Sequence, residues 1–197
     1  LMTYIAYQER MSRQQTQHIL HAFSGLLHTL DPLQPVANRQ SQSSSLKELQ
    51  DTLDISNNLS DELRGELYYS LGAHYMQLDA FSSAADAFSV SLNFVDNDLA
   101  KINLAWCTRE KAHRMADGDA AQKVFKDALA LVSPIMQRRY PTGDAKQDYI
   151  ILFARNRYAS ILLALPDAES HHQALKVLKE IDGELRNRTG VERWLLP

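Results

Sequence analysis

The sequence predicts an all-α fold built from antiparallel helix pairs. Its 197 residues include only seven glycines and six prolines, which is few for a chain of this length. No stretch alternates apolar and polar residues for long enough to indicate a strand. Apolar residues instead recur at intervals of three and four in successive segments, each bounded by capping residues, glycine or proline. Together these observations favour helices over strands throughout the chain.

The first predicted helix runs from about Thr3 to Thr29, within an N-terminal region at residues 1–31. Asp31-Pro32 ends it, because the residue before a proline is pushed out of the α region. Residues 32–45 contain two prolines and three consecutive serines, and we interpret them as a flexible linker. The apolar residues of the helix share one side at a helical period: Ile5, Ile19, Phe23, Leu26, Leu27 and Leu30.

Residues 46–197 are predicted to form one helical repeat domain. Its first helix begins at Ser45, where Glu48 completes a capping box, and breaks at Asn57-Asn58. The buried edge of this helix is expected at Leu46, Leu49, Leu53 and Ile55. Six further helices span about Asp61–Leu78, Phe81–Phe94, Leu99–Ala116, Ala120–Arg139, Ala145–Leu165 and Glu169–Arg188. Pro134 either ends or bends the helix predicted at Ala120–Arg139.

A pattern of residue sizes repeats along the second helix of each predicted pair. A small residue is followed one turn later by a large apolar one, and after two turns by a third buried position. A small side chain lets paired helices approach closely, and the large one fills the space beside them. The three sets are Ala84, Phe88 and Ser91; Ala121, Phe125 and Ala128; and Ala174, Leu178 and Ile181.

The first pair carries a more specific motif on its first helix. Tyr68, Leu71-Gly72 and Tyr75 precede Ala84 in the stretch YYSLGAHYMQLDAFSSAADAF. This segment resembles a tetratricopeptide repeat, which has an aromatic residue, Leu-Gly and Tyr on one helix and Ala, Phe and Ala on the next. The resemblance covers residues 61–190, although later units keep the pattern only on their second helix, and it implies a right-handed solenoid. Gly72 is expected to let the paired helix pack against bare backbone.

The order of the segments has a second resemblance. A long N-terminal helix, a polar gap and a tetratricopeptide-like repeat resemble the region beyond the membrane span in bacterial Ser/Thr kinases and winged-helix transcription regulators. This resemblance implies a sensor or scaffold region on the extracytoplasmic side of the inner membrane, attached through a span before residue 1. The alternative is a free-standing cytoplasmic adaptor or assembly factor. A span or an initiator methionine just before Leu1 in the full-length gene distinguishes the two.

The resemblance also implies where a partner binds. Ligands of tetratricopeptide repeats lie along the concave face, and tryptophan, tyrosine and arginine are common at binding hot spots. The competing interpretation places Trp106 in the core between repeats. The partner-binding residues expected on the concave face are Tyr69, Met76, Gln77, Asn103, Trp106, Glu110, His113, Arg114 and Asn156.

Composition and motifs exclude several other classes of function. The net charge of −3, without a basic stripe, argues against nucleic acid as a ligand. No phosphate loop, nucleophile elbow or zinc-protease motif is present, so we expect no enzyme activity and no cofactor. The single cysteine, Cys107, is expected to be a buried small hydrophobe. His18, His21 and His28 lie near one side of the first helix, most simply as a solvated face rather than a metal site.

The expected partner is therefore a protein or peptide. Self-association into a homodimer is a further alternative, because the apolar side of the first helix can pack either on its own repeats or on a second chain. Light scattering at high concentration distinguishes these arrangements.

Overall fold

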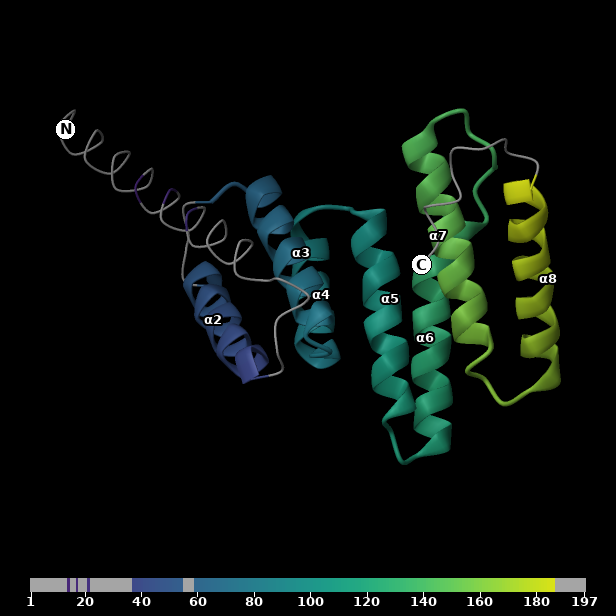
Figure 1. Cartoon of the computed structure of the whole chain (residues 1–197), viewed down its shortest axis with the longest axis horizontal. Coiled ribbons are helices and arrows are strands. Elements are labelled where there is room, and N and C mark those ends of the chain that lie inside the picture. Colours follow the sequence, from purple (N-terminus) through teal and green to yellow (C-terminus); the bar gives the residue numbers. More distant parts are fainter. Residues whose placement is uncertain (1–13, 15–16, 18–20, 22–36, 55–58, 187–197) are drawn as a thin grey trace. The chain divides into compact units, whose positions relative to one another are not determined.

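The structure, a computed structural model, describes residues 37–54 and 59–186 together with the isolated positions 14, 17 and 21. All regular secondary structure in these residues is helical, which confirms the all-α prediction (Figure 1). The predicted helix at Thr3–Thr29 falls outside the described residues, except that Gln14, Gln17 and His21 are helical and exposed. Among the described helices, none is both long and apolar enough to cross a membrane.

The described chain divides into two compact units, which meet in sequence at Val95 and Asp96. Residues 46–197, predicted to form one repeat domain, contribute to both units. The units are called unit 1 (up to Val95) and unit 2 (from Asp96).

Unit 1 contains α2 (Ala37–Asp54), α3 (Asp61–Gln77) and α4 (Phe81–Phe94). Helices α3 and α4 form a hairpin, and α2 packs against α3. The prediction that the first of these helices begins at Ser45 was wrong, because α2 begins at Ala37 and overlaps most of the expected linker. The physical reason is that residues 37–54 contain neither glycine nor proline, and serine costs a helix little when flanked by good helix formers.

Two tyrosines of α3 hold α2 in place. The hydroxyl of Tyr68 donates a hydrogen bond to Asp54, and that of Tyr75 donates to Oε1 of Gln50 at 3.2 Å. Burial raises the pKa of both tyrosine hydroxyls, so they remain protonated donors at neutral pH.

The buried edge of α2 consists of three of the predicted leucines, each at most 5% exposed: Leu46, Leu49 and Leu53.

Glycines of α3 allow the close approach of α4. A Cβ added at Gly72 would lie 2.8 Å from ring atoms of the fully buried Phe88. Gly65 makes a second close approach, since a Cβ there would lie 2.6 Å from the side chain of Val95. The hydroxyl of Ser91 donates to the Gly65 carbonyl at 2.7 Å. The predicted role of Gly72 is therefore confirmed, whereas Gly65 was missed.

His74 of α3 is a buried histidine whose folded state favours the neutral ring. It is 7% exposed, and burial lowers its pKa below the ordinary value of 6.5. The unfolded chain therefore binds a proton more readily, and the free energy of unfolding of unit 1 should decrease as the pH falls below about 6.5. Above that pH, His74 is neutral in both states and its contribution to stability is complete.

We expect His74→Gln to remove this part of the pH dependence. Hydrogen exchange of α3 and α4 amides, converted to opening free energies at a series of pH values, measures it. The wild type should lose more stability on acidification than the variant does. Equal slopes for the two proteins would show that another group is responsible.

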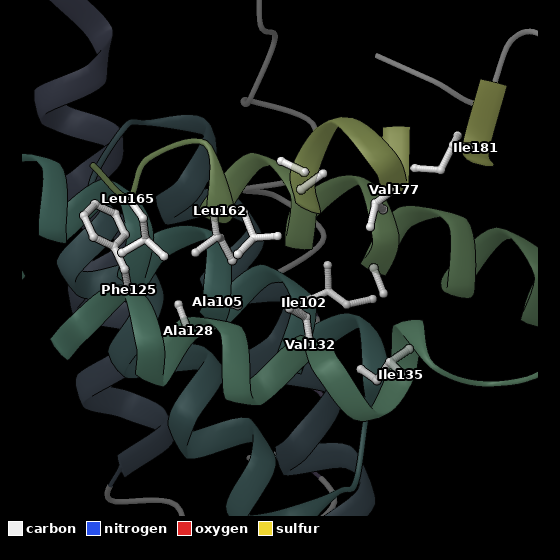
Figure 2. Packing of buried hydrophobic residues seen from close by; sticks show 14 of the residues in the cluster. Ile102, Ala105, Phe125, Ala128, Val132, Ile135, Leu162, Leu165, Val177 and Ile181 are labelled. Carbon is white, nitrogen blue, oxygen red and sulfur yellow. The ribbon is translucent and has the colours of Figure 1, made fainter. Parts of the chain in front are cut away.

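Unit 2 contains α5 (Asp98–His113), α6 (Gly118–Met136), α7 (Ala145–Leu162) and α8 (Ala168–Arg186). Successive helices pack against each other, and α5 also packs against α7 (Figure 1). Side chains from all four helices form one apolar core (Figure 2). Its labelled members include Ile102, Ala105, Phe125, Ala128, Val132, Ile135, Leu162, Leu165, Val177 and Ile181.

The repeated size pattern corresponds to buried positions in both units. Ala84, Ala121 and Ala174 are all at most 8% exposed, as predicted for small residues between packed helices. Of the large residues one turn later, Phe88 and Phe125 are buried, while Leu178 is half-buried beside the core. The third positions, Ser91, Ala128 and Ile181, are also buried.

Sequence signals placed most of these boundaries within a few residues. Asn97, Asp117 and Asp144 cap α5, α6 and α7, each accepting hydrogen bonds from two backbone N–H groups of the first turn. Helix α6 ends at Met136, two residues after Pro134, rather than at Arg139. Proline lacks the N–H that an interior position must donate, so a helix rarely extends far beyond it.

Polar contacts tie α7 to the rest of unit 2. Arg155 pairs with Glu184 of α8, with Nη1 at 2.8 and 2.9 Å from the two carboxylate oxygens, and its Nε donates to the carbonyl of Met136 at 3.1 Å. The buried carboxylate of Asp148 accepts from the backbone N–H and the hydroxyl of Thr142, each at 2.7 Å. These bonds fix the loop that enters α7.

Candidate functional site

The candidate site lies where α5 and α7 pack together in unit 2. Helical spacing sets its side chains: Trp106 and Arg109 are three residues apart on α5, and Phe153 and Arg157 are four apart on α7. Residues at these intervals share a helix face, so each helix presents one aromatic ring and one guanidinium. We call Trp106, Arg109, Glu110, Phe153 and Arg157 the arginine–tryptophan cluster.

The Trp106 ring is flanked by two guanidinium groups. The central carbon of Arg157 lies 3.9 Å from the centre of the Trp106 ring and 4.9 Å from that of Phe153. The corresponding carbon of Arg109 lies 4.6 Å from the Trp106 ring. These are cation–π distances, and such contacts are stronger where water is partly excluded. The Trp106 ring itself is half-buried, so part of it faces solvent.

The charges of the cluster do not balance. Arg109 forms an ion pair with Glu110, its neighbour on α5. Arg157 forms no ion pair or hydrogen bond with any residue that the structure describes, although Glu110 is near enough to act on its charge, and its buried Nε is without a partner there. Burial, and secondly the nearby positive charge of Arg109, lower the pKa of the Arg157 guanidinium. It remains charged at neutral pH, because an arginine starts from a very high pKa.

The structure places the predicted residues of unit 2 in different settings. Trp106 and Glu110 belong to the cluster. Asn103 is buried at 7% exposure and therefore belongs to the interior of the unit. Asn156 is half-buried on α7, next to Arg157 in sequence, while Arg114 is exposed at the C-terminal cap of α5. The ring of the exposed His113 is T-shaped against the Phe125 ring, with ring centres 5.3 Å apart.

The predicted residues of unit 1 form no comparable group. Tyr69 is half-buried, and its ring is tilted against the buried Phe88 at 5.6 Å between centres. Met76 is half-buried, and Gln77 is exposed at the last residue of α3. Tyr69 therefore contributes to the packing of the α3–α4 hairpin.

Three members of the cluster were not predicted from the sequence: Arg109, Phe153 and Arg157. Their spacing within each helix was visible, since an aromatic residue followed by arginine at i+3 or i+4 is a cation–π pair. Their convergence depends on the packing of α5 against α7, which no local pattern specifies. Trp106 and Glu110 are the two members of the cluster that were among the residues expected on a concave face.

Chemically reactive groups are not gathered at the cluster. Burial raises the pKa of the Cys107 thiol to about 12, so the thiol is protonated at neutral pH and a poor nucleophile. This agrees with the expected role of Cys107 as a small buried hydrophobe. In the described part of the chain, no three His, Cys, Asp or Glu residues are grouped to hold a metal ion. His18 and His28 lie outside that part.

No family model matches the chain, and searches of curated proteins and of solved structures found no significant match.

Proposed function

We propose that the chain is a non-catalytic module that binds a protein or peptide partner through the surface of α5 and α7. The observation that supports this function is the half-buried Trp106 flanked by Arg109 and Arg157. Binding hot spots are enriched in tryptophan and arginine, particularly where side chains are already held by their neighbours. The cluster is held in this way, because each guanidinium lies over an aromatic ring.

The packing of unit 2 also favours a binding role. Buried apolar residues of α5 and α7 belong to one core, members of which Figure 2 shows, so the helices that carry the cluster are packed together. A preorganised surface loses less conformational entropy when a partner binds. The tetratricopeptide-like motif of Tyr68, Gly72 and Ala84 supports the same class of module. We therefore propose a tetratricopeptide-like solenoid of helix pairs.

The wider setting of this module is proposed from the order of its sequence segments. We propose the extracytoplasmic sensor or scaffold region of a bacterial signalling protein, either a kinase or a transcription regulator. The free-standing cytoplasmic adaptor remains the alternative.

Affinity capture with matched variants tests the proposed binding role. The tagged chain is incubated with extract of the cells that make it, and retained proteins are quantified by mass spectrometry. A specific partner should be retained by the wild type and by Leu175→Ala, which alters an exposed leucine of α8. Trp106→Ala should reduce the affinity for that partner about 30-fold, the effect of losing a hot spot of about 2 kcal/mol.

The melting temperature and circular dichroism of each variant show whether it is folded. Retention of the same partners by the wild type and a folded Trp106→Ala variant would contradict the proposed function. The proposed function would also be contradicted if the wild type retained no protein above the level of a tag-only control.

A further inference from the structure

The five residues of the arginine–tryptophan cluster carry one more positive charge than negative charge. It contains two guanidinium groups, of Arg109 and Arg157, and one carboxylate, of Glu110. Glu110 is paired with Arg109 and is also near enough to act on Arg157, but no described carboxylate forms an ion pair with Arg157, so two guanidinium groups share one carboxylate. A partly desolvated charge without a counter-ion costs free energy, and an anion placed beside it recovers that cost. The cluster is thus better suited to an anionic ligand than to a neutral or cationic one.

The two terminal Nη nitrogens of Arg157 are the donors that such a ligand can use, because Nε is buried. The central carbon of its guanidinium lies 3.9 Å from the centre of the Trp106 ring and 4.9 Å from that of Phe153, so both rings contact the group. The N–H donors of a guanidinium point outward in its plane, where they match the two oxygens of a carboxylate. The buried Nε is closed to solvent, so a ligand would bind the two Nη nitrogens of the half-buried Arg157.

We propose that this cluster binds the carboxylate of an acidic residue in a peptide segment of the partner. This inference rests on the proposed function and specifies the chemistry of the partner at the same site. A singly charged carboxylate matches the single unbalanced charge of Arg157. The carboxylate of Glu110, beside Arg109, disfavours a doubly charged phosphate at the same place. Trp106 and Phe153 provide apolar contact for side chains next to the acidic residue.

A pair of peptides that differ in one atom group tests the proposal. The probes are Ac-Leu-Glu-Leu-amide and Ac-Leu-Gln-Leu-amide, titrated into the full chain. Binding is followed by the indole N–H resonance of Trp106, assigned by its loss in Trp106→Phe. The glutamate peptide should shift this resonance saturably and bind at least about 10-fold more tightly than the glutamine peptide, equivalent to about 1.4 kcal/mol.

Substitutions then assign the preference to Arg157. Arg157→Gln should abolish the difference between the two peptides, whereas Arg139→Gln, which alters an exposed arginine after α6, should preserve it. Arg157→Lys should keep part of the preference, because the charge remains but the planar fork is lost. If Arg157→Gln does not fold, the wild-type comparison and Arg157→Lys still decide the question.

Two outcomes would overturn the inference. One is equal binding of the glutamate and glutamine peptides to the wild type. The other is a stronger shift of the Trp106 resonance by inorganic phosphate than by acetate, which would assign the site to phosphate instead. Equal peptide binding combined with loss of the natural partner in Trp106→Ala would reject the acidic ligand while retaining the proposed function. Failure of both experiments would reject both.

Discussion

Gly72→Val should destabilise unit 1 by about 2–3 kcal/mol, as expected when a well-packed core is overfilled. The added Cβ would lie 2.8 Å from two ring atoms of Phe88, and the ring cannot move away easily because it is fully buried. The gain in helix propensity from replacing glycine is smaller than this cost. Hydrogen exchange of α3 and α4 amides reports the opening free energy of this unit directly.

Gly183→Val is the matched control for that substitution. Gly183 also lies inside a helix, α8, but a Cβ added there meets no atom within 4 Å. We expect Gly183→Val to change stability by less than about 0.5 kcal/mol. Phe88→Leu, combined with Gly72→Val, should recover part of the lost stability by making room. If Gly72→Val changed the opening free energy as little as Gly183→Val does, the close packing of α3 on α4 would not depend on a glycine at position 72.

Phe125→Ala should destabilise unit 2 by about 3–5 kcal/mol, because it removes a large buried ring and leaves a cavity. Phe125 is 5% exposed within the apolar core, and it also supports the His113 ring. Phe125→Leu should cost clearly less, since it keeps most of the buried volume. Loss of protection in α5, α6 and α7 amides measures both effects. A loss below about 1 kcal/mol for Phe125→Ala would contradict the assigned role of this residue.

The sequence predicted helices best where short-range chemistry determines them. Ser60 and Asn97 are good N-caps, and their helices begin next to them as that chemistry requires. The sequence failed at α2, because the serines around Ser45 are equally compatible with a linker and with a helix interior. Gly65 was missed because its role depends on the distant Val95, which no local signal connects with it.

The candidate site was only partly visible in the sequence. Trp106 and Glu110 were expected on a binding surface, and the structure places both in the arginine–tryptophan cluster. Asn103, predicted on the same surface, is buried at 7% exposure. Arg157 was not expected at the site. It is assigned there because its guanidinium contacts the Trp106 ring on another helix and because its buried Nε has no partner among the described residues. Both properties arise only when α5 and α7 pack together.

Site-specific photo-crosslinking tests most directly whether the surface of α5 and α7 is where a partner binds. A benzophenone amino acid is placed at the exposed position 114, four residues after Glu110 at the end of α5, so that Trp106 is kept. In a second protein it is placed at the exposed position 175 on α8. We predict that irradiation with the captured partner gives a crosslink from position 114, to a partner segment that contains an acidic residue, and none from position 175. A crosslink from position 175 alone would contradict the assignment of this surface.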